Sequence, residues 1–446
     1  MLEPAHHADV VIVGAGVAGL SAAHQLTSAG VTTVVLEAAP YVGGRMSTEK
    51  VDGFRLDRIG QLLTTSYPEL RRTPGLDALV LRPFVPGVLV HSDGRHHRAV
   101  ESTSPRRARG ALTAARALAS APLASRTART APRTTPLGGA LDQARLGAAL
   151  ARVAATDPKR LLARPELPAS QALFARGLPA RTVSGFLRPL LSALLCDPDL
   201  TTSSRCADLA LHSFARGRLC LPEGGAEALP ELLSAALPPG TVRTGVRVTA
   251  VSTTSVTTAD HGEVSCRAVL LATDARAAAE LLPGLRVPSF HQVTVVHHAA
   301  PEPPLAEPAL LLDADRGGPV AHTAVISHVD PSRAPAGRAL VSSTVLGPPP
   351  DERAVLAHLA ELYGTSTARW ETLAVHHTRE AVPAMPPPHD LRRPVRLLAG
   401  LYVCGDHRDT STVQGALYSG RRAARAALAD FGVGSASGTG QLPMAA

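Results

Sequence analysis

The sequence predicts an α/β protein in which one domain is assembled from distant segments of the chain and an α+β domain is interleaved with it. An apolar run at residues 10–13 is followed directly by a glycine-rich turn and a helical pattern. A second strand–turn–helix pattern begins at residues 400–404. Because such units share one parallel sheet, both ends of the chain should meet in the first domain. Strand patterns at residues 290–377 predict a second, antiparallel sheet.

The first turn reads Gly-Ala-Gly-Val-Ala-Gly and precedes a helix predicted for residues 20–29. Gly14 permits the tight turn, Gly16 lets the backbone approach a pyrophosphate, and Gly19 lets the helix pack closely on the strand. The order of strand, glycines and helix distinguishes a dinucleotide site from an ordinary tight turn. The sequence therefore predicts a Rossmann-like unit whose loop is Gly14, Ala15, Gly16, Val17, Ala18 and Gly19.

An acidic residue, Glu37, ends the second predicted strand, about 20 residues beyond the glycines. Its carboxylate can accept hydrogen bonds from both hydroxyls of an adenosine ribose. An acid at this position disfavours a 2′-phosphate, so the ligand is predicted to be FAD or NAD rather than NADP.

A second glycine loop, Gly43, Gly44 and Arg45, follows Glu37 closely. Here the backbone can meet a phosphate and the guanidinium can neutralise it. An NAD dehydrogenase does not need this second loop, so FAD is the favoured cofactor.

Hydrophobic patterns predict strands and helices in the rest of the chain. Apolar residues at helical spacing predict helices, and short apolar runs bounded by Gly or Pro predict strands. The strand at residues 264–271 ends in Ala272 and Thr273, small residues that suit a close approach to a nucleotide. The other predicted strands are residues 31–36, 53–57, 88–90, 242–251, 255–258, 292–296, 320–328 and 339–346, and the other predicted helices are residues 141–155, 180–195, 226–237, 351–363 and 417–428.

The chain length favours two domains. A chain of 446 residues with 45% apolar residues is too long for one ordinary core but can bury a sizeable one. Its Gly/Ser-rich end predicts a disordered tail. The predicted divisions are residues 1–85, 206–284 and 395–431 for the FAD-binding domain, residues 86–205 and 285–394 for the substrate domain, and residues 432–446 for the tail.

The five cysteines form no C-x-x-C pair and no metal-ligand spacing. We therefore expect separate buried thiols, no disulfide and no metal. The chain shows no signal-peptide pattern and no apolar run long enough to span a bilayer. The prediction is a cytoplasmic protein, soluble or peripheral to the membrane.

The net charge of +8 comes almost entirely from arginine, since Lys50 and Lys159 are the only lysines. Few aromatic residues are available to stack on bases, so we expect no nucleic-acid partner. Residues 101–135 concentrate arginines, which favours a solvated surface segment. Attraction to an anionic membrane surface or substrate remains an alternative for this segment.

Taken together, the motifs resemble the superfamily of FAD-dependent amine oxidases, protoporphyrinogen oxidases and phytoene desaturases. The resemblance covers the nucleotide-binding parts from end to end, whereas the helical insertion matches only loosely. Residues 186–189 and 203–205 are similar to a desaturase-like branch. The motifs that carry the resemblance are residues 14–19, Glu37, residues 43–45, residues 222–225, Gly405 with Asp406, and residues 414–416.

The resemblance implies roles for several residues. Asp406 would hold the ribityl chain, and Arg45 would lie between pyrophosphate and flavin. The backbone N–H groups at a helix start near Gln414 would face the pyrimidine end of the isoalloxazine, where negative charge develops on reduction. Val246 or Val248 would present a strand edge to adenine. Besides the glycine loops and Glu37, the expected cofactor-binding residues are Val246, Val248, Ala272, Thr273, Gly405, Asp406, Val413, Gln414 and Ala416.

The chain also departs from the superfamily pattern. Relatives show Asp, one residue and then Gly after the first flavin strand, whereas two residues separate Asp57 from Gly60 here. Amine-oxidising members use a lysine in the substrate sheet and an aromatic cage beside the flavin. This chain has no lysine beyond Lys159, and Thr412 stands where a cage tyrosine is expected.

These departures favour an FAD-dependent oxidoreductase that removes hydride from a hydrophobic small molecule by transfer to flavin N5. An amine oxidase, an isomerase that uses reduced flavin without net redox change, and a flavin-binding protein without turnover are the alternatives. The electron acceptor is left open. The flavin performs the central chemistry itself, so little acid–base machinery is obligatory. His407, directly after Asp406, is the candidate titrating group near the ring.

Overall fold

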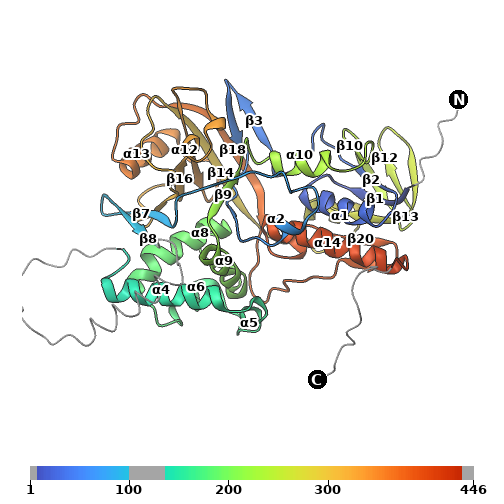
Figure 1. Ribbon diagram of the computed structural model, residues 1–446, viewed down its shortest axis with the longest axis horizontal. Helices are drawn as coiled ribbons and strands as arrows, with labels where there is room; N and C mark the ends of the chain where they lie inside the picture. The colour runs from blue at the N-terminus through green and yellow to red at the C-terminus, as the bar shows by residue number, and fades with distance from the viewer. Residues whose placement is uncertain (1–7, 100–135, 434–446) are drawn as a thin grey trace, which may run out of the picture.

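The computed structural model describes residues 8–99 and 136–433 (Figure 1). The arginine-rich segment at residues 101–135 and nearly all of the predicted tail lie outside the described residues. At one end of the molecule an eight-stranded sheet packs with helices α1 and α14, and at the other end a seven-stranded sheet lies above a group of helices. The prediction of an α/β fold with a discontinuous nucleotide-binding domain is confirmed.

Four parallel strands form the centre of the eight-stranded sheet. The first strand, β1, pairs with β2 on one side and with β13 on the other, and β20 continues the sheet beyond β13. Residues 10–12 are completely buried, as expected for a strand covered on both faces. These four strands are β1 (Ala8–Val13), β2 (Thr33–Leu36), β13 (Glu263–Leu271) and β20 (Leu401–Val403).

The prediction of a single strand at residues 242–251 is wrong, because the structure has two strands there. β10 (Val242–Arg243) pairs in parallel with β2, whereas β11 (Val248–Val251) pairs antiparallel with β12 (Ser255–Thr258). Gly245 separates them with a φ of +74°, a conformation that glycine adopts without strain. Its N–H bonds to the carbonyl oxygen of Ala39, which redirects the chain.

Two long helices cross beside this sheet. α1 (Val17–Ser28) and α14 (Val413–Asp430) pack against each other, and both begin three or four residues earlier than predicted. The hydroxyl of Thr412 caps α14 by accepting a hydrogen bond from the N–H of Gly415 at 3.1 Å. The expected cofactor-binding residues near Gln414 therefore lie in the first turn of α14.

The seven-stranded sheet contains the predicted antiparallel strands. Its order is β18-β14-β17-β16-β15-β7-β8. Residues of α13 (Glu352–Tyr363) share an apolar core with strands of this sheet. The strand predicted for residues 320–328 is shorter, because residues 326–329 form helix α12 (Ile326–Val329). The strands are β7 (Val88–Ser92), β8 (Arg95–Ala99), β14 (Phe290–Ala300), β15 (Leu311–Asp313), β16 (His322–Val325), β17 (Ala339–Val345) and β18 (Glu371–Pro383).

The helical region packs around α9 (Ser204–Arg216), which contacts α4 most extensively. No helix among the described residues has the length and apolar character needed to cross a bilayer. The remaining elements are β3 (Thr48–Val51), β4 (Phe54–Asp57), β5 (Leu63–Thr64), α2 (Glu69–Arg72), β6 (Leu81–Pro83), α4 (Ala140–Ala155), α5 (Pro158–Leu162), α6 (Ala169–Phe174), α7 (Ala180–Thr182), η1 (Val183–Leu187), α8 (Arg188–Leu195), β9 (Leu219–Pro222), α10 (Ala228–Ala235), α11 (Ala275–Leu281), η2 (Pro331–Arg333), β19 (Arg396–Leu398) and η3 (Asp406–Arg408).

The crossing of α1 and α14 should not tolerate a side chain at Gly420. A Cβ there would lie 2.1 Å from the carbonyl oxygen of Ala18, so the helices would have to separate. We expect Gly420→Ala to destabilise the protein by about 1–3 kcal/mol. As a control, Gly147→Ala in α4 adds a Cβ with no atom within 4 Å and should stabilise slightly. Thermal unfolding of both variants tests this, and equal midpoints would contradict the close packing.

Candidate functional site

A cavity of about 640 Å³ opens at the carboxyl ends of the parallel strands. The sequence prediction placed its cofactor here, and all of the expected cofactor-binding residues except three line the cavity. Ala15, Gly19 and Gln414 do not. The expected residues that line it are Gly14, Gly16, Val17, Ala18, Glu37, Gly43, Gly44, Arg45, Val246, Val248, Ala272, Thr273, Gly405, Asp406, Val413 and Ala416.

The two glycine loops lie side by side in this cavity. Gly16 and Gly43 form an isolated parallel bridge, and the N–H of Gly43 donates to the carbonyl oxygen of Ala15 at 2.9 Å. A Cβ at Gly19 would lie 2.1 Å from the oxygen of Gly14, so only glycine allows this contact between helix and strand. A Cβ at Gly16 would meet no atom within 4 Å, so its backbone is open to a ligand. This geometry fits a pyrophosphate at the start of α1.

Glu37 is held in place by backbone donors. Its Oε2 accepts the N–H of Ala15 at 2.7 Å, and its Oε1 accepts the N–H of Ala39 at 2.9 Å. A carboxylate oxygen can accept two hydrogen bonds, so each oxygen keeps capacity for one ribose hydroxyl. The side chain is half-buried and lines the cavity. The structure thus fits the predicted role.

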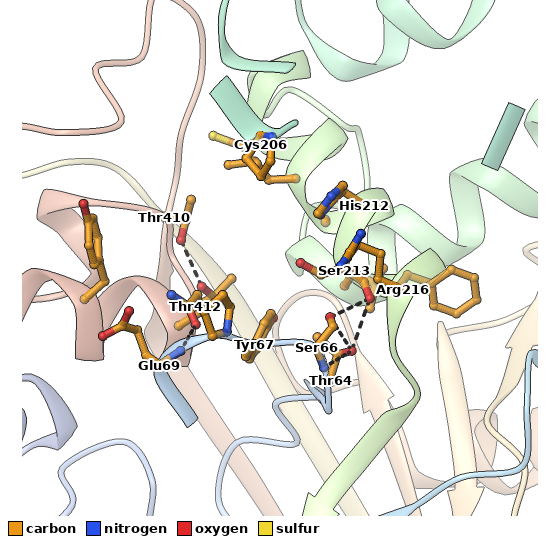
Figure 2. A pocket seen from close by; sticks show the side chains of 18 of the residues that line it. Thr64, Ser66, Tyr67, Glu69, Cys206, His212, Ser213, Arg216, Thr410 and Thr412 are labelled. Atoms are coloured by element: carbon orange, nitrogen blue, oxygen red, sulfur yellow. Dashed lines mark hydrogen bonds between the residues drawn. The ribbon is translucent and has the colours of Figure 1, made fainter. Parts of the chain in front are cut away.

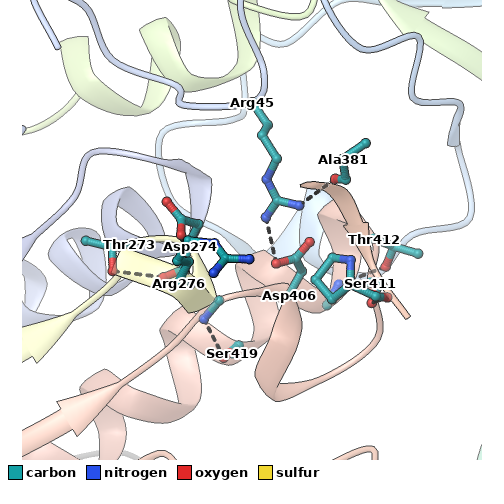
Figure 3. Close-up of polar contacts among 12 residues, drawn as sticks. Arg45, Thr273, Asp274, Arg276, Ala381, Asp406, Ser411, Thr412 and Ser419 are labelled. Atoms are coloured by element: carbon teal, nitrogen blue, oxygen red, sulfur yellow. Dashed lines mark hydrogen bonds and ion pairs between the residues drawn. The ribbon is translucent and has the colours of Figure 1, made fainter. Parts of the chain in front are cut away.

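Arg45 joins the cavity to the seven-stranded sheet (Figure 3). Its Nη2 donates to Oδ1 of Asp406 at 2.7 Å, and its Nη1 donates to the carbonyl oxygen of Ala381 in β18 at 2.8 Å. The side chain of Asp406 is only 8% exposed, so the ion pair is shielded on the carboxylate side. Both residues are therefore fixed before any cofactor contact is made.

Figure 2 shows a second, larger cavity of about 820 Å³. Thr412, the cap of α14, lines both cavities and marks where they meet. Gln414, expected at the flavin, lines the larger cavity, and its Oε1 accepts the N–H of Glu69 at 2.9 Å. The apolar part of the wall includes Leu62, Tyr67, Leu195, Leu209, Phe214 and Met385.

The acids buried on this larger cavity are already paired with arginines. Glu69 is 1% exposed and accepts two hydrogen bonds from Arg421, at 2.8 and 2.6 Å. Asp409 accepts one from Arg422 at 3.3 Å. The solvent-exposed charges on the wall are mostly positive: besides Asp157 they are Arg71, Arg72, Arg216 and Arg392. No lysine among the described residues lines either cavity.

His407 does not line either cavity. Burial lowers the pKa of its imidazole to about 4, and neither ring nitrogen has a hydrogen-bond partner among the described residues. A neutral, enclosed imidazole is a poor candidate for proton transfer near pH 7. Its proposed catalytic role gains no support from its position.

Asp409 is a better placed titrating group that the sequence reasoning passed over. It lines the larger cavity, and burial raises the pKa of its carboxyl group to about 6. The sequence placed it two residues after His407, but gave no sign that its side chain would face the larger cavity.

A glycine-loop nucleotide cavity that meets a second, largely apolar cavity at a helix start is the arrangement of a flavoprotein oxidoreductase. The chain belongs to the family of flavin-containing amine oxidoreductases, whose family model matches residues 17–428. This membership confirms the predicted superfamily, FAD as the cofactor, and an FAD-dependent oxidoreductase as the class of enzyme.

Individual relatives are similar over short segments. A putrescine oxidase from Kocuria rosea is 50% identical over 68 residues, which is 15% of this chain and 14% of that protein. A carotenoid 3,4-desaturase from Haloarcula japonica is 51% identical over 49 residues, 11% of this chain and 10% of that protein. Because these matches span so little of the relatives' length, they do not identify a substrate.

Solved structures share this fold, with matches that cover 96% of the chain. A putative protoporphyrinogen oxidase from Exiguobacterium has a TM-score of 0.67 at 18% identity, covering 96% of this chain and 99% of its own. A putrescine oxidase bound to putrescine has a TM-score of 0.65 at 20% identity, covering 96% and 100%. At these identities the likeness concerns the fold.

Glu37→Ala should weaken FAD retention, because it removes the carboxylate predicted to bind the ribose. Losing two charge-assisted hydrogen bonds costs about 2–4 kcal/mol, or about 30-fold or more in affinity. Titration of the apoprotein with FAD measures the effect. Glu280→Ala, which removes an acid from the same cavity, should bind FAD normally. Unchanged affinity in the Glu37 variant would reject the ribose assignment.

Proposed function

We propose that this protein is an FAD-dependent oxidoreductase that dehydrogenates a hydrophobic small molecule in the larger cavity. The charge pattern of that cavity is the main support. Its buried carboxylates are neutralised by Arg421 and Arg422, and most of its exposed charges are guanidinium groups. Such a wall repels an ammonium ion and leaves apolar surface for a neutral or anionic molecule.

The size of this repulsion is sufficient to discriminate. Two like charges about 4 Å apart repel by about 1 kcal/mol in water and by about 4 kcal/mol at an effective dielectric constant of about 20. An ammonium near one unpaired guanidinium would thus lose about 5-fold or more in affinity. Two other features also disfavour an amine substrate: neither cavity wall contains a described lysine, and Thr412 stands where a cage tyrosine is expected.

When bound, the flavin accepts a hydride from a substrate C–H placed against its ring. Dehydrogenation to a double bond also releases a proton from the neighbouring atom. Asp409 can accept this proton because it lines the larger cavity and burial raises the pKa of its carboxyl group to about 6. The positive end of α14, an 18-residue helix, would favour negative charge on the reduced ring.

Amine oxidation is the second candidate, favoured by the family description and by the putrescine oxidase match. The match to a carotenoid desaturase is equally short, so these two matches do not decide between the candidates. Isomerisation with reduced flavin is the third candidate.

Anaerobic mixing with candidate substrates separates these functions. We expect apolar alkenes or saturated tetrapyrroles in detergent to bleach the flavin absorbance, and primary amines, polyamines and amino acids to leave it unchanged. Rapid bleaching by any amine would establish the second candidate instead. Conversion of substrate only after addition of a reductant, with no oxidant consumed, would indicate the isomerase.

The rate of flavin reduction should depend on the protonation of Asp409. Its carboxylate is the proton-accepting form and is present above a pKa of about 6, so the rate should rise as pH increases from about 5 to 7. Asp409→Asn should lower the rate by about 100-fold or more and remove this rise. Asp390→Asn, at an exposed acid outside both cavities, serves as the control. A normal pH profile in the Asp409 variant would exclude it as the base.

A further inference from the structure

We propose that the seven-stranded sheet contains a binding site for a divalent transition-metal ion, made by His91, Asp313 and Asp315. One ligand atom from each of these residues lies within 4.8 Å of the other two. None of the three lines the cavity at the glycine loops or the larger cavity. This site goes beyond the proposed function and does not depend on it.

The fold brings these residues together from distant parts of the chain. β7 and β15 are parallel neighbours, and His91 is the register partner of Asp313. Register partners project from the same face of a sheet, so the two side chains start side by side. Asp315 follows two residues after the end of β15, and its N–H bonds back to Oδ1 of Asp313 at 3.0 Å.

The buried, unpartnered ring of His91 points to a bound ligand. The residue is 2% exposed, and neither ring nitrogen has a hydrogen-bond partner among the described residues. Its Nδ1 lies 4.0 Å from Oδ2 of Asp315. Buried polar nitrogens are rarely left unpartnered, and a metal ion would satisfy this one. Two atoms that share an ion at about 2 Å lie about 3–4 Å apart, so little movement is needed.

The two carboxylates are already oriented by other groups. Oδ1 of Asp315 accepts the Ser92 hydroxyl and Oδ2 accepts the N–H of Asp93, both at 2.7 Å. Each oxygen of Asp315 keeps one free acceptor position.

Asp313 is oriented from the other side by α13. Nδ1 of His358 accepts the N–H of Val320 at 3.2 Å, so the proton of this imidazole lies on Nε2. Nε2 is 3.2 Å from Oδ2 of Asp313 and donates to it. Outer groups of this kind orient carboxylate ligands in known metal sites.

The ligand chemistry favours Zn²⁺ over Mg²⁺ or Ca²⁺. One neutral imidazole and two carboxylates balance the charge of a divalent ion, and the imidazole nitrogen suits zinc, whereas Mg²⁺ and Ca²⁺ prefer oxygen ligands. Because the site lies away from both cavities, the ion would join β7 to the turn after β15. We therefore expect an effect on stability rather than on the flavin reaction.

The test measures Zn²⁺ binding and thermal unfolding of the untagged, FAD-loaded protein after EDTA treatment and dialysis. The wild type should bind one equivalent of Zn²⁺ by calorimetry, and its unfolding temperature should rise with Zn²⁺. His91→Phe keeps a buried ring but removes the ligand nitrogen. It should fold normally in EDTA, bind Zn²⁺ at least about 10-fold more weakly, and lose the rise in unfolding temperature.

A second variant and a control complete the test. Asp315→Asn changes an exposed ligand, so it should fold and should also lose the Zn²⁺ response. Asp93→Asn changes the neighbouring exposed acid, whose side chain is not part of the site, and should behave like wild type. The proposal would be overturned if the wild type bound no equivalent of Zn²⁺. It would also be overturned if both ligand variants bound Zn²⁺ and were stabilised as the wild type is, since the ion would then bind only adventitiously to surface histidines.

Discussion

The close contact between the glycine turn, α1 and α14 is the constraint on which the rest of the structure depends. Gly19 approaches the oxygen of Gly14 and Gly420 approaches Ala18, each at a distance that leaves no room for a Cβ. The Ser21 hydroxyl also donates to the oxygen of Leu417 at 2.9 Å, across 396 residues of sequence. Because α1 and α14 are held together here, the start of α14 lies at the edge of the cavity that the glycine loops line.

A second connection links this nucleotide-binding sheet to the seven-stranded sheet. Arg45 bonds to Asp406 after β20 and to Ala381 in β18, so one guanidinium spans both parts of the protein. Asp57 of β4 makes further links: its carboxylate pairs with Arg333 of η2 at 2.8 Å, and its carbonyl oxygen lies 3.0 Å from Nε2 of His297 in β14. Asp57 precedes the loop in which the glycine is displaced by one residue. Its ion pair gives this acid a structural partner, Arg333 of η2.

Sequence reasoning succeeded where the signal is local. Residues 10–37 contain strand, glycine turn, helix and acid in one continuous stretch, and the fold follows that order. It failed at residues 242–251, where a glycine with positive φ interrupts a run of strand-forming residues. It also gave no warning of His91, Asp313 and Asp315, which are brought together by strand register across 222 residues. The sequence likewise does not reveal the pairing of Glu69 with Arg421, which are 352 residues apart, or the charge of the larger cavity.

That charge explains why the family resemblance alone leaves the substrate open. The residues of the glycine loops that line a cavity, and Glu37, line only the smaller one, where the shared cofactor is expected, so they are compatible with any substrate. Our proposal assigns substrate discrimination to the larger cavity, which is lined by residues of α2, α9 and the start of α14. Arg421 and Arg422 pair with the buried acids of this cavity. Arg421, Arg422 and Thr412 belong to or directly precede α14, the helix that also borders the flavin cavity. One helix therefore provides both the N-terminus at the smaller cavity and the arginines that pair with the buried acids of the larger one.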